Sequence, residues 1–97
     1  MSPKNKKKLL VIRKKLDLID NKLLNLLKIR ANHVKKVLSL KEHKNEIIDK
    51  KRINKILKNI KSKSIKKGID PKISSRIWKN MIYAFVDFEY RNFKKKK

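Results

Sequence analysis

The feature that most limits how this chain can fold is a regular apolar stripe in its first third. Apolar side chains recur at alternating intervals of three and four residues, which places them on one face of an α-helix. Neither proline nor glycine interrupts the stretch from Lys6 to Lys41, so one continuous helix is predicted there. The stripe comprises Leu9, Ile12, Leu16, Ile19, Leu23, Leu26, Val34 and Val37.

A helix of this length is too long for a small monomer to cover. At 1.5 Å per residue it extends about 54 Å, whereas a compact domain of 97 residues has a radius of gyration of about 13 Å. Much of the stripe would face water in a monomer, so we expect a second copy of the chain to cover it in an intertwined homodimer. The alternative is a break near residue 30, which would give a monomer of four shorter helices.

Two further helices account for most of the remaining chain. The polar segment 42–45 predicts a turn, and a second helix is expected from near Glu46, with Asn45 as its cap, to the single glycine, Gly68. A third helix is expected to begin at Asp70 and Pro71, an N-cap residue followed by proline at the first helical position. Its apolar residues are Ile73, Ile77, Trp78, Met81, Ile82, Phe85 and Phe88, with Phe93 as a further candidate.

These elements predict an all-α fold with three helices per protomer and a long first helix. No stretch shows the alternation of apolar and polar residues that is typical of a strand. The length predicts a single domain over residues 1–97. The basic ends, residues 1–6 and 94–97, are expected to be disordered tails.

The net charge of the chain would suit a polyanionic partner, but the distribution of its cations does not indicate a binding site for one. The chain carries 31 Lys and Arg against 8 Asp and Glu, a formal net charge of +23, and such a balance is typical of nucleic-acid-binding proteins. However, lysines occur along the whole chain, and Trp78, Phe85 and Phe88 lie on the apolar stripe of the third helix instead of among the lysines. A non-catalytic basic protein that binds nucleic acid is therefore an alternative, and nucleic acid is not the expected partner.

Other classes of function are disfavoured by composition. The chain has no cysteine, which excludes disulfides and thiolate chemistry. His33 and His43 lack the neighbours of a metal site, so we expect no metal. No apolar run approaches the roughly 20 residues of a membrane span, and LLVI after the basic start is too short for a signal peptide. We therefore expect a cytoplasmic protein that does not enter a membrane.

Two cations, Arg30 and Lys41, lie in line with the apolar stripe of the first helix. They are separated by about 16 Å along the axis and about 20° around it, so a small anion could bind between them. Arg13 lies about 25 Å from Arg30 on another face. In a dimer of crossing helices it could reach the partner's site, which predicts a pocket shared by two protomers. The simpler interpretation is that Arg30 and Lys41 extend from the edge of the core to solvent.

Three further polar residues have both a simple and a functional interpretation. Asp49 and Arg52 lie three residues apart on one face of the expected second helix, and a surface ion pair is the simplest interpretation. Glu89 continues the apolar stripe of the third helix. A carboxyl group there must pair with a cation or stay protonated, because burying it ionised is costly. If the last turn frays, Glu89 instead reaches water.

Together these residues resemble the all-helical (AroQ-class) chorismate mutases. The resemblance extends over about residues 9–93 and is most specific from Ile12 to Arg30, IRKKLDLIDNKLLNLLKIR. It continues through Lys41, DKKR at 49–52 and GIDPKISSRIWKNMI at 68–82. The resemblance implies an interlocked homodimer with two shared active sites and no cofactor. Its implied reaction is the rearrangement of chorismate to prephenate, in the biosynthesis of phenylalanine and tyrosine.

The resemblance also implies which residues act on the substrate. Chorismate is a dicarboxylate, and its intramolecular Claisen rearrangement requires no nucleophile, metal or proton transfer. The enzyme must hold the folded conformer and stabilise negative charge on the breaking ether oxygen. The implied catalytic residues are Lys41, Glu89, Arg30 and Arg13, and the implied substrate-binding residues are these four with Asp49, Arg52, Ile53 and Phe85.

Each implied residue has a distinct role in that scheme. Arg30 and the partner's Arg13 would clamp the two carboxylates, and Lys41 would face the ether oxygen. Glu89 would lie beside that oxygen in its protonated form, because a carboxylate would repel the developing charge. Arg52 would lie near a substrate carboxylate or orient its neighbours, and the region of Asp49 would meet the ring hydroxyl.

Two positions depart from the family pattern. Ile53 stands where the family usually has a glutamate that holds the ring hydroxyl, and Phe85 stands where it often has serine or another small residue. Both changes remove polar contacts to the substrate. A related enzyme of the same fold, an isochorismate pyruvate-lyase, therefore remains an alternative.

Overall fold

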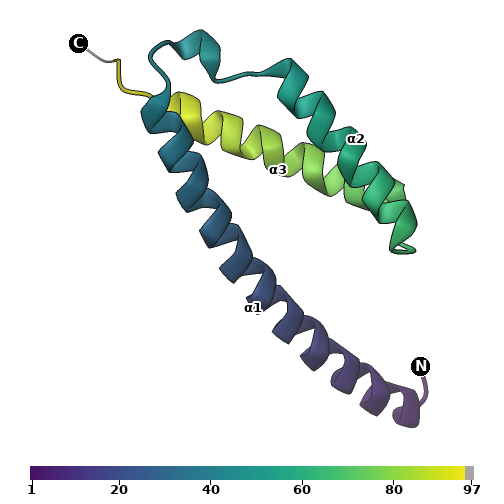
Figure 1. The fold of residues 1–97 in the computed structure, drawn as a ribbon. Helices are drawn as coiled ribbons and strands as arrows, with labels where there is room; N and C mark the ends of the chain where they lie inside the picture. Colours follow the sequence, from purple (N-terminus) through teal and green to yellow (C-terminus); the bar gives the residue numbers. More distant parts are fainter. Residues whose placement is uncertain (96–97) are drawn as a thin grey trace. The chain divides into compact units, whose positions relative to one another are not determined.

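The computed structural model describes residues 1–95, and every α-helix and turn of helix in it belongs to one of four elements. These are α1 (Pro3–Leu40), a short 3₁₀ turn η1 (Lys44–Glu46), α2 (Lys50–Lys66) and α3 (Pro71–Asn92) (Figure 1). No strand occurs among the described residues, which confirms the all-α prediction. The chain divides into two compact units, Met1–His33 and Val34–Lys97.

Helix α1 is continuous, so the predicted alternative of a break near residue 30 is wrong. Its 38 residues extend about 57 Å. The helix begins earlier than predicted, because Ser2 caps it: the Asn5 N–H donates to Ser2 Oγ at 3.2 Å. Pro3 then occupies the first helical position, where its missing N–H carries no penalty. Residues 3–6, expected to be disordered, are therefore helical.

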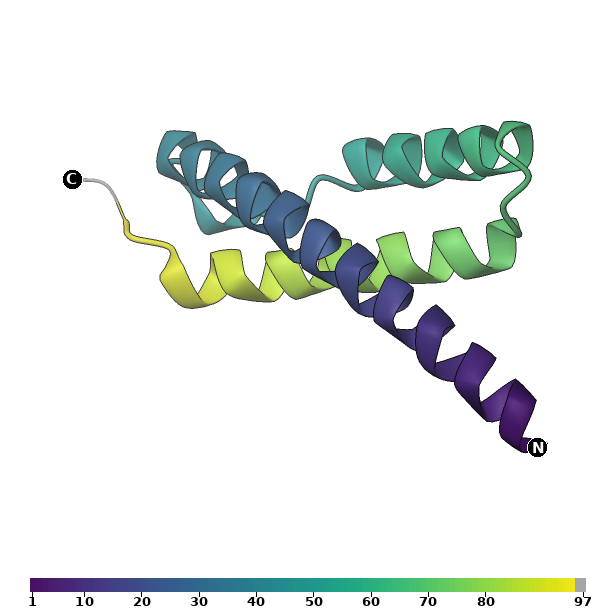
Figure 2. The same ribbon diagram turned by 90° about the horizontal axis from the view of Figure 1, so that it is seen from below.

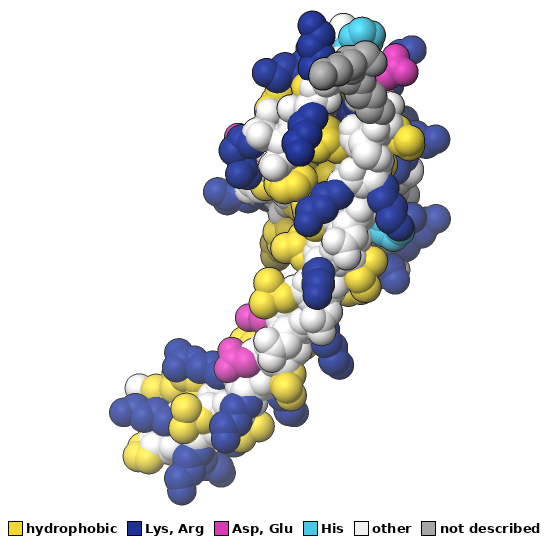
Figure 3. Space-filling model, turned by 90° about the vertical axis from the view of Figure 1, so that its left-hand side faces the viewer, with side chains coloured by type: hydrophobic (Ala, Val, Ile, Leu, Met, Phe, Trp, Pro, Cys, Tyr) yellow, Lys and Arg dark blue, Asp and Glu magenta, His cyan; other side chains and the backbone are white. Residues whose placement is uncertain are grey.

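Most of the apolar stripe of α1 is exposed, and only Leu9 and Val34 in it are half-buried. No residue of α1 is buried, and the exposed fraction is 53% for Ile12, 50% for Ile19 and 56% for Leu23. Figure 3 shows apolar side chains along the lower, N-terminal part of α1, interspersed with Lys and Arg. Exposure of so many large apolar side chains along one helix is characteristic of an interaction site.

In the unit Val34–Lys97, α2 and α3 pack against one another as an antiparallel pair (Figure 2). Ile47, Ile53 and Ile82 form its buried apolar core. Ser64 and Ser74 are also buried, with their Oγ atoms 2.6 Å apart. Because the Ser64 hydroxyl donates to the carbonyl oxygen of Ile60 at 2.6 Å, Ser74 acts as donor to Ser64. The Ser64 hydroxyl thus both donates and accepts a hydrogen bond where the helices meet.

The connection from α2 to α3 agrees with the sequence prediction. Gly68 adopts a left-handed φ of 72°, which glycine accepts without strain. The Gly68 and Ile69 N–H groups donate to the carbonyls of Ile65 and Ser64 at 3.1 and 2.9 Å, the pattern of a Schellman motif. Asp70 Oδ1 then accepts the Lys72 N–H at 2.9 Å and caps α3. Phe93 lies one residue beyond the end of α3.

The prediction for the start of α2 was wrong by four residues. The helix begins at Lys50 instead of near Glu46, and its cap is Asp49 instead of Asn45. Asp49 has an extended conformation, and its Oδ1 accepts the backbone N–H of Arg52 at 3.0 Å. Asp49 and Arg52 therefore do not share a helix face, and the spacing that suggested an ion pair is that of an N-cap.

Residues 94–95 follow α3 without regular structure, and residues 96–97 of the expected C-terminal tail lie outside the described residues. Among the residues described, no helix combines the length and the apolar character that crossing a membrane requires.

Candidate active site

The most distinctive polar contact of the chain joins Lys41 to Glu89. Lys41 Nζ lies 2.7 Å from Glu89 Oε2, and the exposed fractions of the two side chains are 17% and 10%. Glu89 lies within α3 and not in a frayed turn. The sequence left three alternatives for Glu89: pairing with a cation, a protonated carboxyl group, or exposure to water through fraying of the last turn. The structure shows the pairing with a cation. The partner is Lys41, which is 48 residues away in the sequence.

Lys41 has a second contact that directs its ammonium group. It is the first residue after α1, and Nζ also lies 3.4 Å from the backbone carbonyl oxygen of Ile47. An ammonium group has three N–H donors, and Glu89 and Ile47 account for two of them. The remaining N–H is available to a ligand. Because the group is largely shielded from water, a hydrogen bond from it to a developing negative charge would be stronger than in solution.

The residues that share the helix face of Glu89 on α3 are apolar. Trp78, Ile82, Phe85 and Glu89 lie on one face of the helix, as predicted: Ile82 and Glu89 are buried, and Trp78 and Phe85 are half-buried. Phe85 precedes Glu89 by one helical turn, so both side chains project from the same face. This side chain makes the region next to Glu89 less polar than a small serine would.

Ile53 lies on the inner face of α2. Only 8% of it is exposed, and it contributes to the apolar core of the α2–α3 pair. It therefore has a packing role that a polar residue could not fill without a partner. Its neighbour Arg52 is exposed, and so is Asp49, which caps α2.

The remaining predicted site residues belong to the unit Met1–His33. Arg13 is exposed and Arg30 is half-buried, both on α1. Their role in binding substrate stays a prediction. Within Val34–Lys97, the structure brings together Lys41 and Glu89, and it engages Asp49 in helix capping instead of an ion pair with the Arg52 guanidinium.

Sequence reasoning missed two residues beside Lys41. Ile47 contributes a backbone carbonyl, which has no signature in a sequence. Glu46 accepts the N–H groups of Glu42 and His43, each at 2.7 Å, through one carboxylate oxygen. A glutamate three residues after a turn residue is a known capping pattern, but the expected helix start near Glu46 concealed it.

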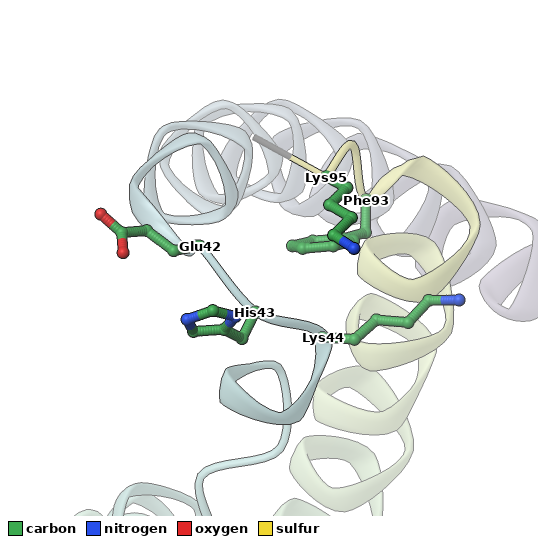
Figure 4. Close-up of a pocket in the computed structure, with 5 residues that line it drawn as sticks. All are labelled: Glu42, His43, Lys44, Phe93 and Lys95. Carbon is green, nitrogen blue, oxygen red and sulfur yellow. The ribbon is translucent and has the colours of Figure 1, made fainter. Parts of the chain in front are cut away.

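A separate pocket lies beyond the end of α1. It has a volume of about 350 Å³ and is lined by Glu42, His43, Lys44, Phe93 and Lys95 (Figure 4). Figure 4 shows that the side chains of Glu42 and His43 extend away from the Phe93 ring. None of the predicted site residues lines this pocket. In residues 1–95, no three His, Asp or Glu side chains gather as a metal site would require.

Comparison with known proteins identifies the family. The family model for chorismate mutase type II matches residues 12–90, a range that includes all eight predicted site residues. No match was found among curated proteins or among solved structures. The match extends over most of the chain, and the three observed helices agree with it. The chain therefore belongs to the type II chorismate mutase family.

Proposed function

We propose that the chain catalyses the Claisen rearrangement of chorismate to prephenate, a step toward phenylalanine and tyrosine. Membership of the family supports chorismate mutase chemistry in general. The observation that carries the specific proposal is the shielded pair of Lys41 and Glu89, at 2.7 Å. The pair presents a shielded ammonium donor, held in place by Glu89, and such a donor would stabilise the negative charge that develops on the ether oxygen.

The proposed mechanism relies on positioning and electrostatics only. Arg30 and the partner's Arg13 hold the two carboxylates of chorismate, so that the reacting carbons approach one another. The remaining N–H of Lys41 donates to the ether oxygen as its bond to carbon breaks. Glu89 accepts a hydrogen bond from the Lys41 ammonium group through Oε2 and thereby helps to direct this group toward the ether oxygen. Arg52 supports a substrate carboxylate, and Asp49 lies on the side of the ring hydroxyl.

The proposed enzyme is a homodimer of one domain per chain, with two shared sites. The exposed stripe of α1, for example Ile12 and Ile19 with half of each residue exposed, supports this assembly because a second copy would bring an identical stripe. About 25 cal/mol is gained for each Å² of apolar surface removed from water. Arg13 is exposed on the same helix, where it can be donated to a partner.

The direct test is an ultraviolet assay of chorismate loss by the purified protein, with the product identified chromatographically. We expect prephenate, and we expect the Arg30→Ala variant to lose about 10²–10³-fold in kcat/KM, because a bidentate charge-assisted contact to the substrate is removed. Arg76→Ala, which removes an arginine outside the predicted site, serves as the matched control and should retain activity. Failure of the wild-type chain to convert chorismate would reject the proposal.

Isochorismate should be assayed in parallel. The buried position of Ile53 and the half-buried ring of Phe85 leave no polar side chain at the two positions where the family pattern has one. That observation favours the pyruvate-lyase as the second candidate. Release of pyruvate from isochorismate without prephenate formation would identify the lyase instead.

A further inference from the structure

The segment that follows Lys41 is closed by a single carboxylate. Beyond the last turn of a helix the backbone N–H groups are no longer organised by the helical ladder. Here the N–H groups of Glu42 and His43 both donate to Glu46 Oε2 at 2.7 Å. The Glu46 N–H in turn donates to the His43 carbonyl at 3.0 Å. The carboxylate thus fixes the direction of the chain immediately after Lys41.

The same turn carries the second contact of the Lys41 ammonium group. Ile47 directly follows Glu46, is only 4% exposed, and has its carbonyl oxygen 3.4 Å from Lys41 Nζ. The Ile47 N–H donates to the carbonyl of Lys44 at 3.2 Å. The Glu46 carboxylate therefore binds the backbone N–H groups just after Lys41. The next residue, Ile47, returns a carbonyl oxygen to the Lys41 ammonium group.

We propose that Glu46 is a positioning residue for the reaction. By closing the turn 42–46, it holds the Ile47 carbonyl against the Lys41 ammonium, so that this carbonyl and Glu89 together direct the remaining N–H toward the substrate. This inference rests on the proposed function, in which Lys41 donates to the ether oxygen. Glu46 itself is exposed and touches neither Glu89 nor any substrate atom that the proposal names.

The electrostatics of Glu46 agree with a functioning anionic cap. The backbone N–H of His43, followed by that of Glu42, lowers the pKa of Glu46 below its ordinary value, and the charges of His43 and Lys41 act in the same direction. A carboxyl group with a lowered pKa stabilises the folded state at neutral pH. That contribution is lost only as the pH falls through the lowered pKa, so the cap is ionised under ordinary assay conditions.

The test compares Glu46→Ala with Glu46→Gln in steady-state kinetics on chorismate. For Glu46→Ala we expect kcat to fall about tenfold with KM changed by less than about twofold, because a misdirected donor impairs the transition state more than substrate binding. Glu46→Gln keeps an acceptor oxygen at the same position, so it should recover a substantial part of kcat. Asp87→Ala, which also removes one exposed carboxylate from this unit, controls for net charge and should leave kcat unchanged.

A second readout is independent of turnover. Amide hydrogen exchange at Glu42 and His43, followed by NMR in the full chain, should accelerate about tenfold in Glu46→Ala if the turn opens. The global stability toward urea is measured alongside, to ensure that each variant is fully folded. The inference is overturned by unchanged kcat, by a rise in KM in place of a fall in kcat, or by unchanged exchange. If the wild-type chain fails to turn over chorismate, the proposed function is rejected, whereas the exchange data still decide whether Glu46 closes the turn.

Discussion

The Lys41→Met variant is expected to lose about 10²–10³-fold in kcat, which is the typical cost of removing one preorganised donor from a developing negative charge. Methionine keeps an unbranched, flexible side chain but has no N–H group. KM should change less than kcat, because the proposed carboxylate clamps on α1 are left in place. A variant that retains more than about a tenth of the wild-type kcat would show that Lys41 is not the principal donor to the ether oxygen.

This substitution also tests the pairing with Glu89. Removing Lys41 leaves a carboxylate that is 10% exposed without its partner at 2.7 Å, which should reduce the free energy of unfolding by about 1–3 kcal/mol. The double variant Lys41→Met/Glu89→Met replaces both charges with apolar groups and should recover most of that stability. Its kcat should remain as low as that of Lys41→Met. Recovery of stability without recovery of kcat separates the structural role of the pair from its proposed catalytic role.

Mixing two inactive variants should restore activity if the active sites are shared. Arg13→Ala and Arg30→Ala should each be inactive as homodimers, since every site would lack one clamp. In a heterodimer of the two, one site has both arginines and the other has neither. With random exchange of subunits half of the dimers are mixed, so activity should recover to about a quarter of the wild-type value. If the mixture stays inactive although subunit exchange is demonstrated, the proposal that each site contains arginines from two chains is rejected.

The apolar stripe of α1 should be necessary for that assembly. Ile19→Glu places a charge in the middle of the stripe, at a residue that is 50% exposed in the single chain. We expect sedimentation to show a monomer of 11.6 kDa and the assay to show little turnover. Asn21→Glu introduces the same charge on the opposite face of α1 and should leave both mass and activity unchanged. If Ile19→Glu keeps the oligomeric state of the wild type, the stripe is not the dimer contact.

Local patterns in the sequence determined the helices with clear boundary signals. The spacing of apolar residues determined α1 as one long element, and Gly68, Asp70 and Pro71 determined the turn from α2 to α3, because backbone geometry there depends on residues within a few positions. The placement of Glu89 on the apolar face of α3 followed from helical periodicity alone. These predictions needed no information on how the helices pack.

The conformation of the segment between α1 and α2 depends on competition between two possible N-cap residues. Asn45 and Asp49 are both good caps, and the sequence alone favoured an early start of α2. In the structure Glu46 binds the N–H groups of Glu42 and His43, which turns the chain into η1 and leaves Asp49 to begin the helix. The side-chain hydrogen bonds that decide the outcome form only in one of the competing turns, so residue preferences do not rank them.

What the sequence by itself determined was the set of helices, the family pattern of cations and acids, and the long apolar stripe for which a second copy of the chain is expected. What only the tertiary structure decided was that Glu89 pairs with Lys41, that Ile47 supplies a carbonyl to the same ammonium, and that Ile53 is part of the core. These contacts join residues on different elements, and their existence depends on how α2, α3 and the end of α1 pack in three dimensions. Helical periodicity places a residue on a face, but only packing determines which group that face meets.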